Sequence, residues 1–196
     1  RIMKDIVLYD NFLPLDDFLK FRKLVTSSDF EWYLSKILVI TPEYLNLPAG
    51  YKELKEAHEK IVNFNPEKDF VCDEIDNYQF THMFYHNNMP LSKYYDEYIQ
   101  PFISLLDMKS LLRAKINLNP RTEKNIRQGF HKDNTIDESF TSVFYFNTND
   151  GYTEFENGEK VHDVENRLIT FPSPYYHTGN SCTNNSYRIV LNLNYF

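Results

Sequence analysis

Residues 187–196 read YRIVLNLNYF, and this stretch decides which fold class the chain can adopt. Two sets of residues alternate along it, with Arg188, Val190, Asn192 and Asn194 set between apolar Ile189, Leu191, Leu193 and Tyr195. Such alternation predicts a β-strand, because successive side chains of a strand point to opposite faces of its sheet. The apolar face can pack on a supporting layer, while the mostly polar face would line a barrel interior. Buried polar groups are costly unless they are paired, so a bound polar ligand would explain that face.

The same period of two recurs upstream, in residues 111–119 and 141–146. Turn signals separate these runs, and Asn157-Gly158 is a strong signal for a two-residue β-hairpin turn. Closely spaced short strands predict a β-sandwich or small barrel for residues 111–196. We therefore expect an α+β, mainly β fold: a double-stranded β-helix, of the jelly-roll or cupin-like kind, with supporting N-terminal helices.

The N-terminal half, residues 1–110, has the pattern of supporting helices and strands. Residues 6–9 predict a strand, and Pro14 opens a helical pattern with Asp16 and Asp17 in its first turn, where acidic side chains suit the helix dipole. Further elements are expected as a strand at residues 30–40 and helices at residues 52–62 and 91–106, the last interrupted near Pro101. With no repeat or flexible linker, residues 1–196 predict a single domain.

Composition narrows the class of protein. The 196 residues carry a net charge of −7, which disfavours a nucleic-acid partner because phosphates would be repelled. Cys72 and Cys182 are too few for a disulfide framework, so a reducing cytoplasm is the expected location. The opening RIMKDIVLYD interleaves charged and apolar residues, and no apolar stretch reaches the roughly 18 residues that cross a bilayer. We expect a soluble protein without a membrane partner.

A metal-binding pattern lies in the predicted barrel. His131 and Asp133 form a His-x-Asp motif, and residues i and i+2 of a strand share a face, so both can reach one metal. His177 is available as a third ligand after several more strands. Two imidazoles and one carboxylate suit iron(II) and leave coordination positions open for a co-substrate and oxygen. Arg188 follows on the last strand, and its guanidinium can hold a carboxylate through two hydrogen bonds.

These residues, in this order, resemble the catalytic core of the 2-oxoglutarate/Fe(II)-dependent oxygenases. The match is with the prolyl-4-hydroxylase-like branch, in its small bacterial and phage type. It rests on His131-Lys132-Asp133, residues 143–147, residues 151–155, residues 166–171, His177 and residues 188–196, with a similar strand and helix at residues 6–26. The least covered part is residues 27–80.

The resemblance implies roles for single residues and a set of cofactors. His131, Asp133 and His177 would be the catalytic iron ligands, and Arg188 and Tyr145 would bind the distal carboxylate of 2-oxoglutarate. Relatives often carry a Tyr where this chain has Asn119, whose amide could still donate a hydrogen bond to the co-substrate. The implied cofactors are Fe(II), 2-oxoglutarate and O2, with ascorbate as a supporting reductant.

Other histidines and other functions are also compatible with parts of this sequence. His82 and His86 could share one face of a helix, but the glutamate of a zinc protease motif is missing, which favours a packing or substrate-cleft role. His162 and His58 have no partner pattern. The competing functions are a cupin-like binding protein, a catalytically silent structural module and a nucleic-acid demethylase. The first usually shows His-x-His with Glu, and the last tends to carry a second Arg on the final strand; neither pattern is present here.

The expected reaction is hydroxylation of a C–H bond, and the resemblance points to a peptidyl prolyl residue as substrate. Composition offers a second argument, because residues 44–51 and 82–95 are rich in aromatic and amide side chains. Aromatic grooves suit extended proline-rich peptides. The alternatives are that these aromatics merely cover the barrel, and that the substrate is a small free metabolite. Oligomeric state is not predicted.

Overall fold

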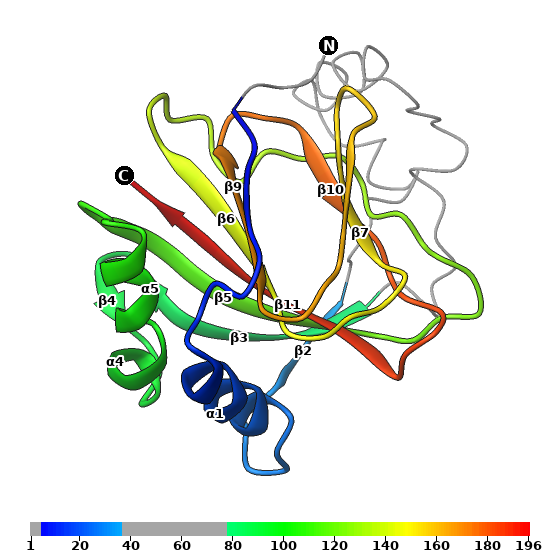
Figure 1. Ribbon diagram of the computed structural model, residues 1–196, viewed down its shortest axis with the longest axis horizontal. Helices are drawn as coiled ribbons and strands as arrows, with labels where there is room; N and C mark the ends of the chain where they lie inside the picture. The colour runs from blue at the N-terminus through cyan, green and yellow to red at the C-terminus, as the bar shows by residue number, and fades with distance from the viewer. Residues whose placement is uncertain (1–4, 37–77) are drawn as a thin grey trace.

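The computed structural model describes residues 5–36 and 78–196. Its main feature is a large antiparallel sheet in the order β1-β9-β6-β11-β5-β3-β2, with β4 paired to β3 (Figure 1). The strands of this sheet are β1 (Val7–Tyr9), β2 (Tyr33–Lys36), β3 (Tyr78–His86), β4 (Met89–Pro90), β5 (Leu111–Pro120), β6 (Phe140–Tyr145), β9 (Arg167–Pro172) and β11 (Tyr187–Tyr195). The N-terminal half therefore contributes strands to the sheet itself as well as helices.

A small second sheet faces the large one. It contains β7 (Tyr152–Phe155), β8 (Lys160–His162) and β10 (His177–Gly179) in the order β10-β7-β8. Two isolated bridges, Arg127 to Asn180 and His131 to His177, place the segment at residues 127–131 beside β10.

Helices cover the other face of the large sheet. They are α1 (Leu15–Val25), α4 (Tyr95–Tyr98) and α5 (Gln100–Leu105), all on the same side of β3 and β5 (Figure 1). Phe21 of α1 packs edge-on against Phe146 at a centroid distance of 4.9 Å, and Phe102 of α5 packs against Phe144 at 5.1 Å. Burying aromatic side chains of this size is a large part of what holds such layers together.

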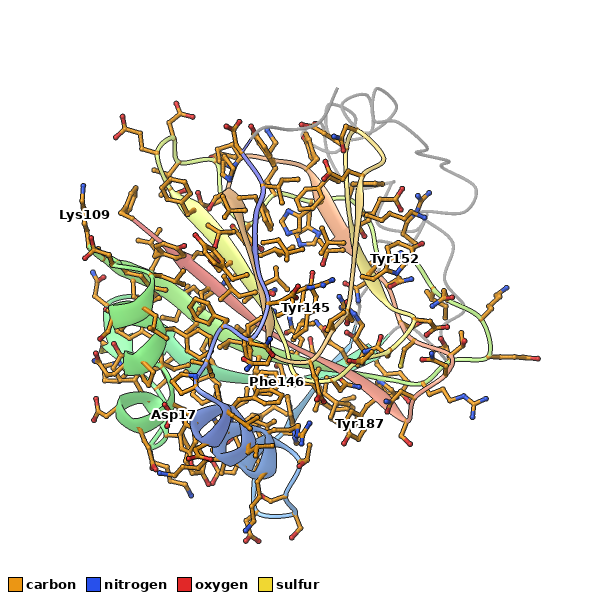
Figure 2. All side chains as sticks on the ribbon, in the orientation of Figure 1. Asp17, Lys109, Tyr145, Phe146, Tyr152 and Tyr187 are labelled. Atoms are coloured by element: carbon orange, nitrogen blue, oxygen red, sulfur yellow. The ribbon has the colours of Figure 1, made fainter. Side chains whose placement is uncertain are left out.

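The side chains of the last strand, β11, alternate between the core under the helices and the cavity between the two sheets, as its sequence pattern predicts. Its apolar members, Ile189, Leu191, Leu193 and Tyr195, belong to the core under the helices. Arg188, Val190 and Asn192 line the cavity between the sheets. Tyr145 and Phe146 divide in the same way, the first between the sheets and the second against α1 (Figure 2).

The predicted N-terminal elements agree with the structure where it describes them. β1 and α1 occupy the expected positions, and Pro14 is the N-cap of α1 with Asp16 and Asp17 in its first turn. The strand expected at residues 30–40 begins at Tyr33 and is described as far as Lys36. The helix expected at residues 52–62 lies outside the described residues.

The interruption expected near Pro101 is present, because residues 91–106 contain two short helices, α4 and α5, with Pro101 near the start of the second. The first of them begins at Tyr95 rather than near residue 91. Proline has no N–H to continue a preceding helix but is tolerated in a first turn, so the break falls just before it. The segment with His82 and His86 is strand β3, not a helix.

The Asn157-Gly158 turn does join two antiparallel strands, β7 and β8. The turn is longer than the two residues expected, because β7 ends at Phe155 and β8 begins at Lys160. Gly158 has a φ of 83°, a conformation that residues with a Cβ rarely adopt. Across the described residues, the structure contains no helix long and apolar enough to cross a membrane.

Candidate metal centre and co-substrate pocket

A cavity of about 290 Å³ lies between the two sheets. Its walls come from β5 and β11 on one side and from β10 and the segment at residues 128–133 on the other. His131, Asp133 and His177 lie in its wall, and so do Arg188 and Asn119. The structure thus brings to one cavity all but one of the site residues predicted from the sequence, the exception being Tyr145.

The three predicted metal ligands converge. Each offers one ligand atom, and these atoms all lie within 4.8 Å of one another. His131 Nε2 is 3.8 Å from Asp133 Oδ1, and His177 Nε2 is 4.0 Å from Asp133 Oδ2. Adjacent ligand atoms about 2.0–2.2 Å from a shared divalent metal lie about 3 Å apart, so these side chains would draw closer together around an ion.

The backbone holds the two histidines together. The N–H of His131 donates to the carbonyl of His177 at 3.0 Å, and the N–H of His177 donates to the carbonyl of His131 at the same distance. The expectation that the His-x-Asp motif sits on a regular strand is wrong, because His131 forms an isolated bridge and Asp133 lies in a bend. The reciprocal pair of hydrogen bonds to β10, together with the contacts of Asp133, does the positioning that a strand was expected to do.

Each imidazole presents the same ring nitrogen to the centre. Nδ1 of His131 lies 3.0 Å from the carbonyl of Gly129, and Nδ1 of His177 lies 3.1 Å from the carbonyl of Tyr175. A carbonyl oxygen can only accept a hydrogen bond, so Nδ1 of each ring carries a hydrogen and Nε2 is the nitrogen that faces the centre. Such backbone contacts also fix the ring orientation of metal-binding histidines.

Asp133 is oriented by two donors. Its side chain is 4% exposed; Arg113 Nη2 donates to Oδ1 at 2.8 Å and Asn194 Nδ2 donates to Oδ2 at 3.0 Å. Burial by itself would raise the pKa of Asp133, but the neighbouring His177, Arg113 and His131 and the Asn194 hydrogen bond outweigh it and hold the pKa well below its usual range. The carboxylate is ionised at neutral pH, the form that binds a metal.

His177 has the complementary protonation state. Burial, opposed in part by Asp133, lowers its pKa to about 4. The imidazole is therefore neutral at pH 7 and available as a ligand without first losing a proton. A buried neutral histidine beside an ionised carboxylate fits a divalent cation better than it fits a structural ion pair.

This lowered pKa predicts acid sensitivity of the metal-free protein. Between the ordinary pKa of 6.5 and about 4, the unfolded chain takes up a proton on His177 that the folded chain does not. The contribution of His177 to the free energy of unfolding is therefore fully present above pH 6.5. It falls by on the order of 3 kcal/mol as the pH drops through this window. Thermal unfolding between pH 7.5 and 4.5 would measure it. His177→Gln should flatten the slope and His162→Gln should not; parallel curves for wild type and His177→Gln would contradict the assignment.

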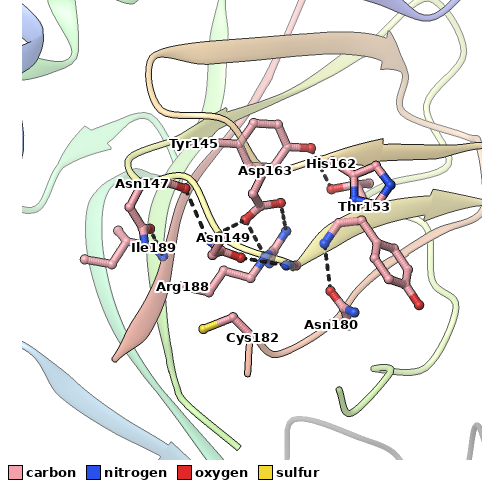
Figure 3. A network of polar contacts seen from close by, with 12 residues as sticks. Tyr145, Asn147, Asn149, Thr153, His162, Asp163, Asn180, Cys182, Arg188 and Ile189 are labelled. Carbon is pink, nitrogen blue, oxygen red and sulfur yellow. Dashed lines mark hydrogen bonds and ion pairs between the residues drawn. The ribbon is translucent and has the colours of Figure 1, made fainter. Parts of the chain in front are cut away.

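Arg188 lines the cavity and lies beside Asp163 and Asn149 in a network of polar contacts (Figure 3). Its Nε lies 2.7 Å from Asp163 Oδ2, and its Nη2 donates to Asp163 Oδ1 at 3.1 Å, in a pair that is almost fully buried. A Cβ added at Gly151 would lie 2.8 Å from Arg188 Cδ, and one at Gly179 would lie 3.1 Å from Nη1. The two glycines thus leave room for the side chain, whose Nη1 end faces the Gly179 side of the cavity.

Tyr145 and Asn119 occupy different positions relative to this arginine. Tyr145 is fully buried beneath the cavity wall, where its hydroxyl donates to Thr153 Oγ1 at 2.8 Å (Figure 3). Burial raises the pKa of its phenol, which stays neutral. Thr153 is the residue of this pair that lines the cavity. Asn119 lines the cavity directly, and its Nδ2 is buried with no acceptor among the described residues.

Sequence reasoning missed Arg113 and Asp163. Arg113 stands on the lumen side of the alternating residues 111–119, a signal that could have marked it, whereas nothing local marks Asp163 as the partner of Arg188. Of the other histidines, His162 lies on β8 outside the cavity lining, and His58 is outside the described residues.

The aromatic groove expected at residues 82–95 is not present. His82 is 4% exposed; its Nδ1 lies 2.7 Å from the carbonyl of Glu31, and its Nε2 lies 2.8 Å from Ser92 Oγ. Phe84 and Tyr94 pack into the core beneath the helices, on the face of the sheet opposite the cavity. These aromatics cover the sheet, and the packing role holds for His82. Residues 44–51 lie outside the described part of the chain.

No protein-family model matches this chain, and no curated protein matches its sequence. Solved structures do match its fold. One is a prolyl hydroxylase from Trichoplax adhaerens in complex with a hypoxia inducible factor oxygen degradation domain peptide fragment. It is 12% identical in sequence, with a TM-score of 0.57, and the match covers 99% of this chain and 84% of that one. Another is a Pseudomonas putida prolyl-4-hydroxylase, with 14% identity, TM-score 0.51 and coverage of 99% and 92%. A third is the non-heme alpha ketoglutarate dependent epimerase SnoN from nogalamycin biosynthesis, with 10% identity, TM-score 0.59 and coverage of 100% and 79%.

At these identities the likeness shows the fold. The chain is a mainly β protein with the double-stranded β-helix architecture, as the alternation of its strands predicts. What the site does must be argued from its own residues.

Proposed function

We propose that the protein is a 2-oxoglutarate- and Fe(II)-dependent dioxygenase that hydroxylates a C–H bond. One observation carries this proposal: His131, Asp133 and His177 converge in the wall of a cavity that Arg188 also lines. Two imidazoles and one carboxylate are the donor set that suits non-haem iron(II) with open coordination positions. The solved structures with this fold include two prolyl hydroxylases and an alpha ketoglutarate dependent epimerase, which supports the proposal.

The residues present fit the metal and its co-substrate. Nε2 of His131, Nε2 of His177 and a carboxylate oxygen of Asp133 would hold iron(II). Iron(II), 2-oxoglutarate and O2 together supply the oxidation of a substrate C–H bond, coupled to release of succinate and carbon dioxide, and ascorbate would support the iron(II) state. The residues of this chain would orient the metal and the co-substrate and would keep the site polar but enclosed.

Arg188 would bind the distal carboxylate of 2-oxoglutarate. Asp163 engages its Nε and Nη2, which leaves the Nη1 end toward the cavity for a second carboxylate. Asn119 would donate from its free Nδ2, in the place where relatives often carry a tyrosine. Tyr145 does not line the cavity, so it would act on the co-substrate indirectly, through the hydrogen bond by which its hydroxyl orients Thr153. Direct contact with the co-substrate would require that hydroxyl to turn toward the cavity.

For the substrate, we propose a peptidyl prolyl residue, with a small free metabolite as the rival. Support for a peptide comes from the Trichoplax structure, which holds a peptide fragment. The aromatic segment at residues 82–95 no longer supports it, because those side chains are core.

Turnover is the direct test. The iron-loaded protein is expected to release succinate from 2-oxoglutarate under oxygen, and Asp133→Ala is expected to release none. Proline-containing peptides and free amino acids, compared side by side, should couple succinate release to a product one oxygen heavier. Absence of 2-oxoglutarate consumption by the metal-loaded protein would remove the oxygenase proposal; coupling to free metabolites alone would remove the peptidyl one.

A further inference from the structure

Strand β5 carries two cations on the face that lines the cavity, Arg113 and Lys115. Arg113 uses Nη2 to hold Asp133, while its Nε is buried without a hydrogen-bond partner. Lys115 has neither an ion pair nor a hydrogen bond within the described ranges 5–36 and 78–196. A buried donor left unpaired costs about 1–3 kcal/mol, and more for a charged group, so the Nε of Arg113 calls for an acceptor, which the neighbouring lysine could share.

The charges in the cavity do not balance. The charge of Arg188 is compensated by Asp163, and the single carboxylate of Asp133 is shared between Arg113 and the proposed metal. Among residues 5–36 and 78–196, Lys115 is left without an anion. Burial, together with the neighbouring Arg113, lowers the pKa of Lys115. Binding an anion at this place would compensate the lysine and give the free Nε of Arg113 an acceptor at the same time.

The surroundings of Lys115 also favour a polar ligand over an apolar one. Lys115 is paired in register with Asn192 of β11, and Asn117 is the next residue on the same face of β5. The Oδ1 atoms of both asparagines are buried without donors in the described part of the chain. This group of unpartnered polar atoms is near the metal ligands, because Arg113 of the same strand face contacts Asp133 directly.

We propose that Arg113 and Lys115 form an anion subsite that binds a carboxylate of the substrate beside the metal ligands. The substrate is therefore an acid: either a free carboxylic acid or a peptide whose acidic side chain or C-terminus enters the cavity. A neutral prolyl segment would leave Lys115 without an anion and the Nε of Arg113 without an acceptor. The role of this subsite in substrate recognition rests on the oxygenase function proposed above, whereas the anion site itself does not.

The test uses the full chain loaded with Zn(II), which is diamagnetic, and saturated with 2-oxoglutarate so that the Arg188 subsite is filled. The probes are acetate, inorganic phosphate and neutral acetamide, and the readout is the NMR resonance of the Arg113 Nε–H group, assigned with Arg113→Lys. Acetate is expected to shift this resonance saturably, and acetamide is not. Phosphate tests the same site with a second oxyanion; saturation by phosphate without acetate would overturn the carboxylate assignment.

Variants separate the subsite from general charge effects. Lys115→Met should weaken acetate binding at least tenfold, since a charge-assisted hydrogen bond is lost. Lys115→Arg should retain it, and the control Lys93→Met, which removes an exposed cation paired with Glu31, should leave it unchanged. The affinity for 2-oxoglutarate should be unchanged in Lys115→Met.

Three further results would overturn the proposal. One is a linear acetate response that sodium chloride reproduces. Another is equal acetate binding by wild type and Lys115→Met. The third is a loss of 2-oxoglutarate affinity in Lys115→Met, which would make Lys115 an anchor for the co-substrate. If the wild type binds neither Zn(II) nor 2-oxoglutarate, the oxygenase proposal fails, and the same acetate titration of the bare protein still decides the anion site.

Discussion

Replacing His177 with alanine is expected to abolish binding of iron(II). The variant keeps two of the three converging ligands and loses the buried, neutral imidazole whose Nε2 faces Asp133 at 4.0 Å. Loss of a mere hydrogen-bond partner of a ligand costs about 10–100-fold in metal affinity, so loss of a ligand should exceed about 100-fold. Calorimetric titration of the metal-free protein with iron(II), under nitrogen, measures the effect directly.

A matched control is available on the same barrel. His162 lies on β8, and its side chain is not among those that line the cavity. His162→Ala should therefore bind iron(II) as wild type does. Equal affinity of His177→Ala and wild type, with both proteins folded by circular dichroism, would show that the three residues converge without forming a metal site.

Replacing Arg188 with alanine is expected to have two separate effects. The first is on stability, because Asp163 would remain buried without its bidentate partner, at a cost of about 3–5 kcal/mol. The second is on 2-oxoglutarate, whose distal carboxylate would lose a charge-assisted contact of about 1.5–3 kcal/mol, at least tenfold in affinity. Denaturant unfolding measures the first effect and calorimetric titration the second.

A double variant distinguishes the two effects. Arg188→Ala with Asp163→Asn removes the orphaned charge, so most of the lost stability should return while 2-oxoglutarate affinity stays low. Arg188→Lys should lose less affinity than Arg188→Ala, because the charge stays while the planar fork is lost. Full 2-oxoglutarate affinity in the stable double variant would mean that Arg188 has only a structural role, as the partner of Asp163.

The sequence by itself determined the strand pattern of the core and the identity of the converging residues. Alternation along residues 187–196 reflects a local property, since neighbouring side chains of a strand must point to opposite faces. The same alternation, without any tertiary contact, predicts which face of this strand is polar and lines the barrel interior and which face is apolar. The order of His131, Asp133, His177 and Arg188 identified the candidate site through resemblance, and the structure brings these four side chains to one cavity.

Tertiary structure alone decided how these residues are held and what else faces them. His131 and Asp133 lie on an irregular segment whose position depends on hydrogen bonds to β10, and no periodicity reports such bonds. The Asp163 partner of Arg188 comes from a loop distant in sequence. The aromatics at residues 82–95 could have lined a groove or covered a sheet, because composition does not say which face a side chain meets. The unpaired donors of Arg113 and Lys115 are likewise visible only once every neighbouring strand is in place, since an unpaired group is defined by what surrounds it.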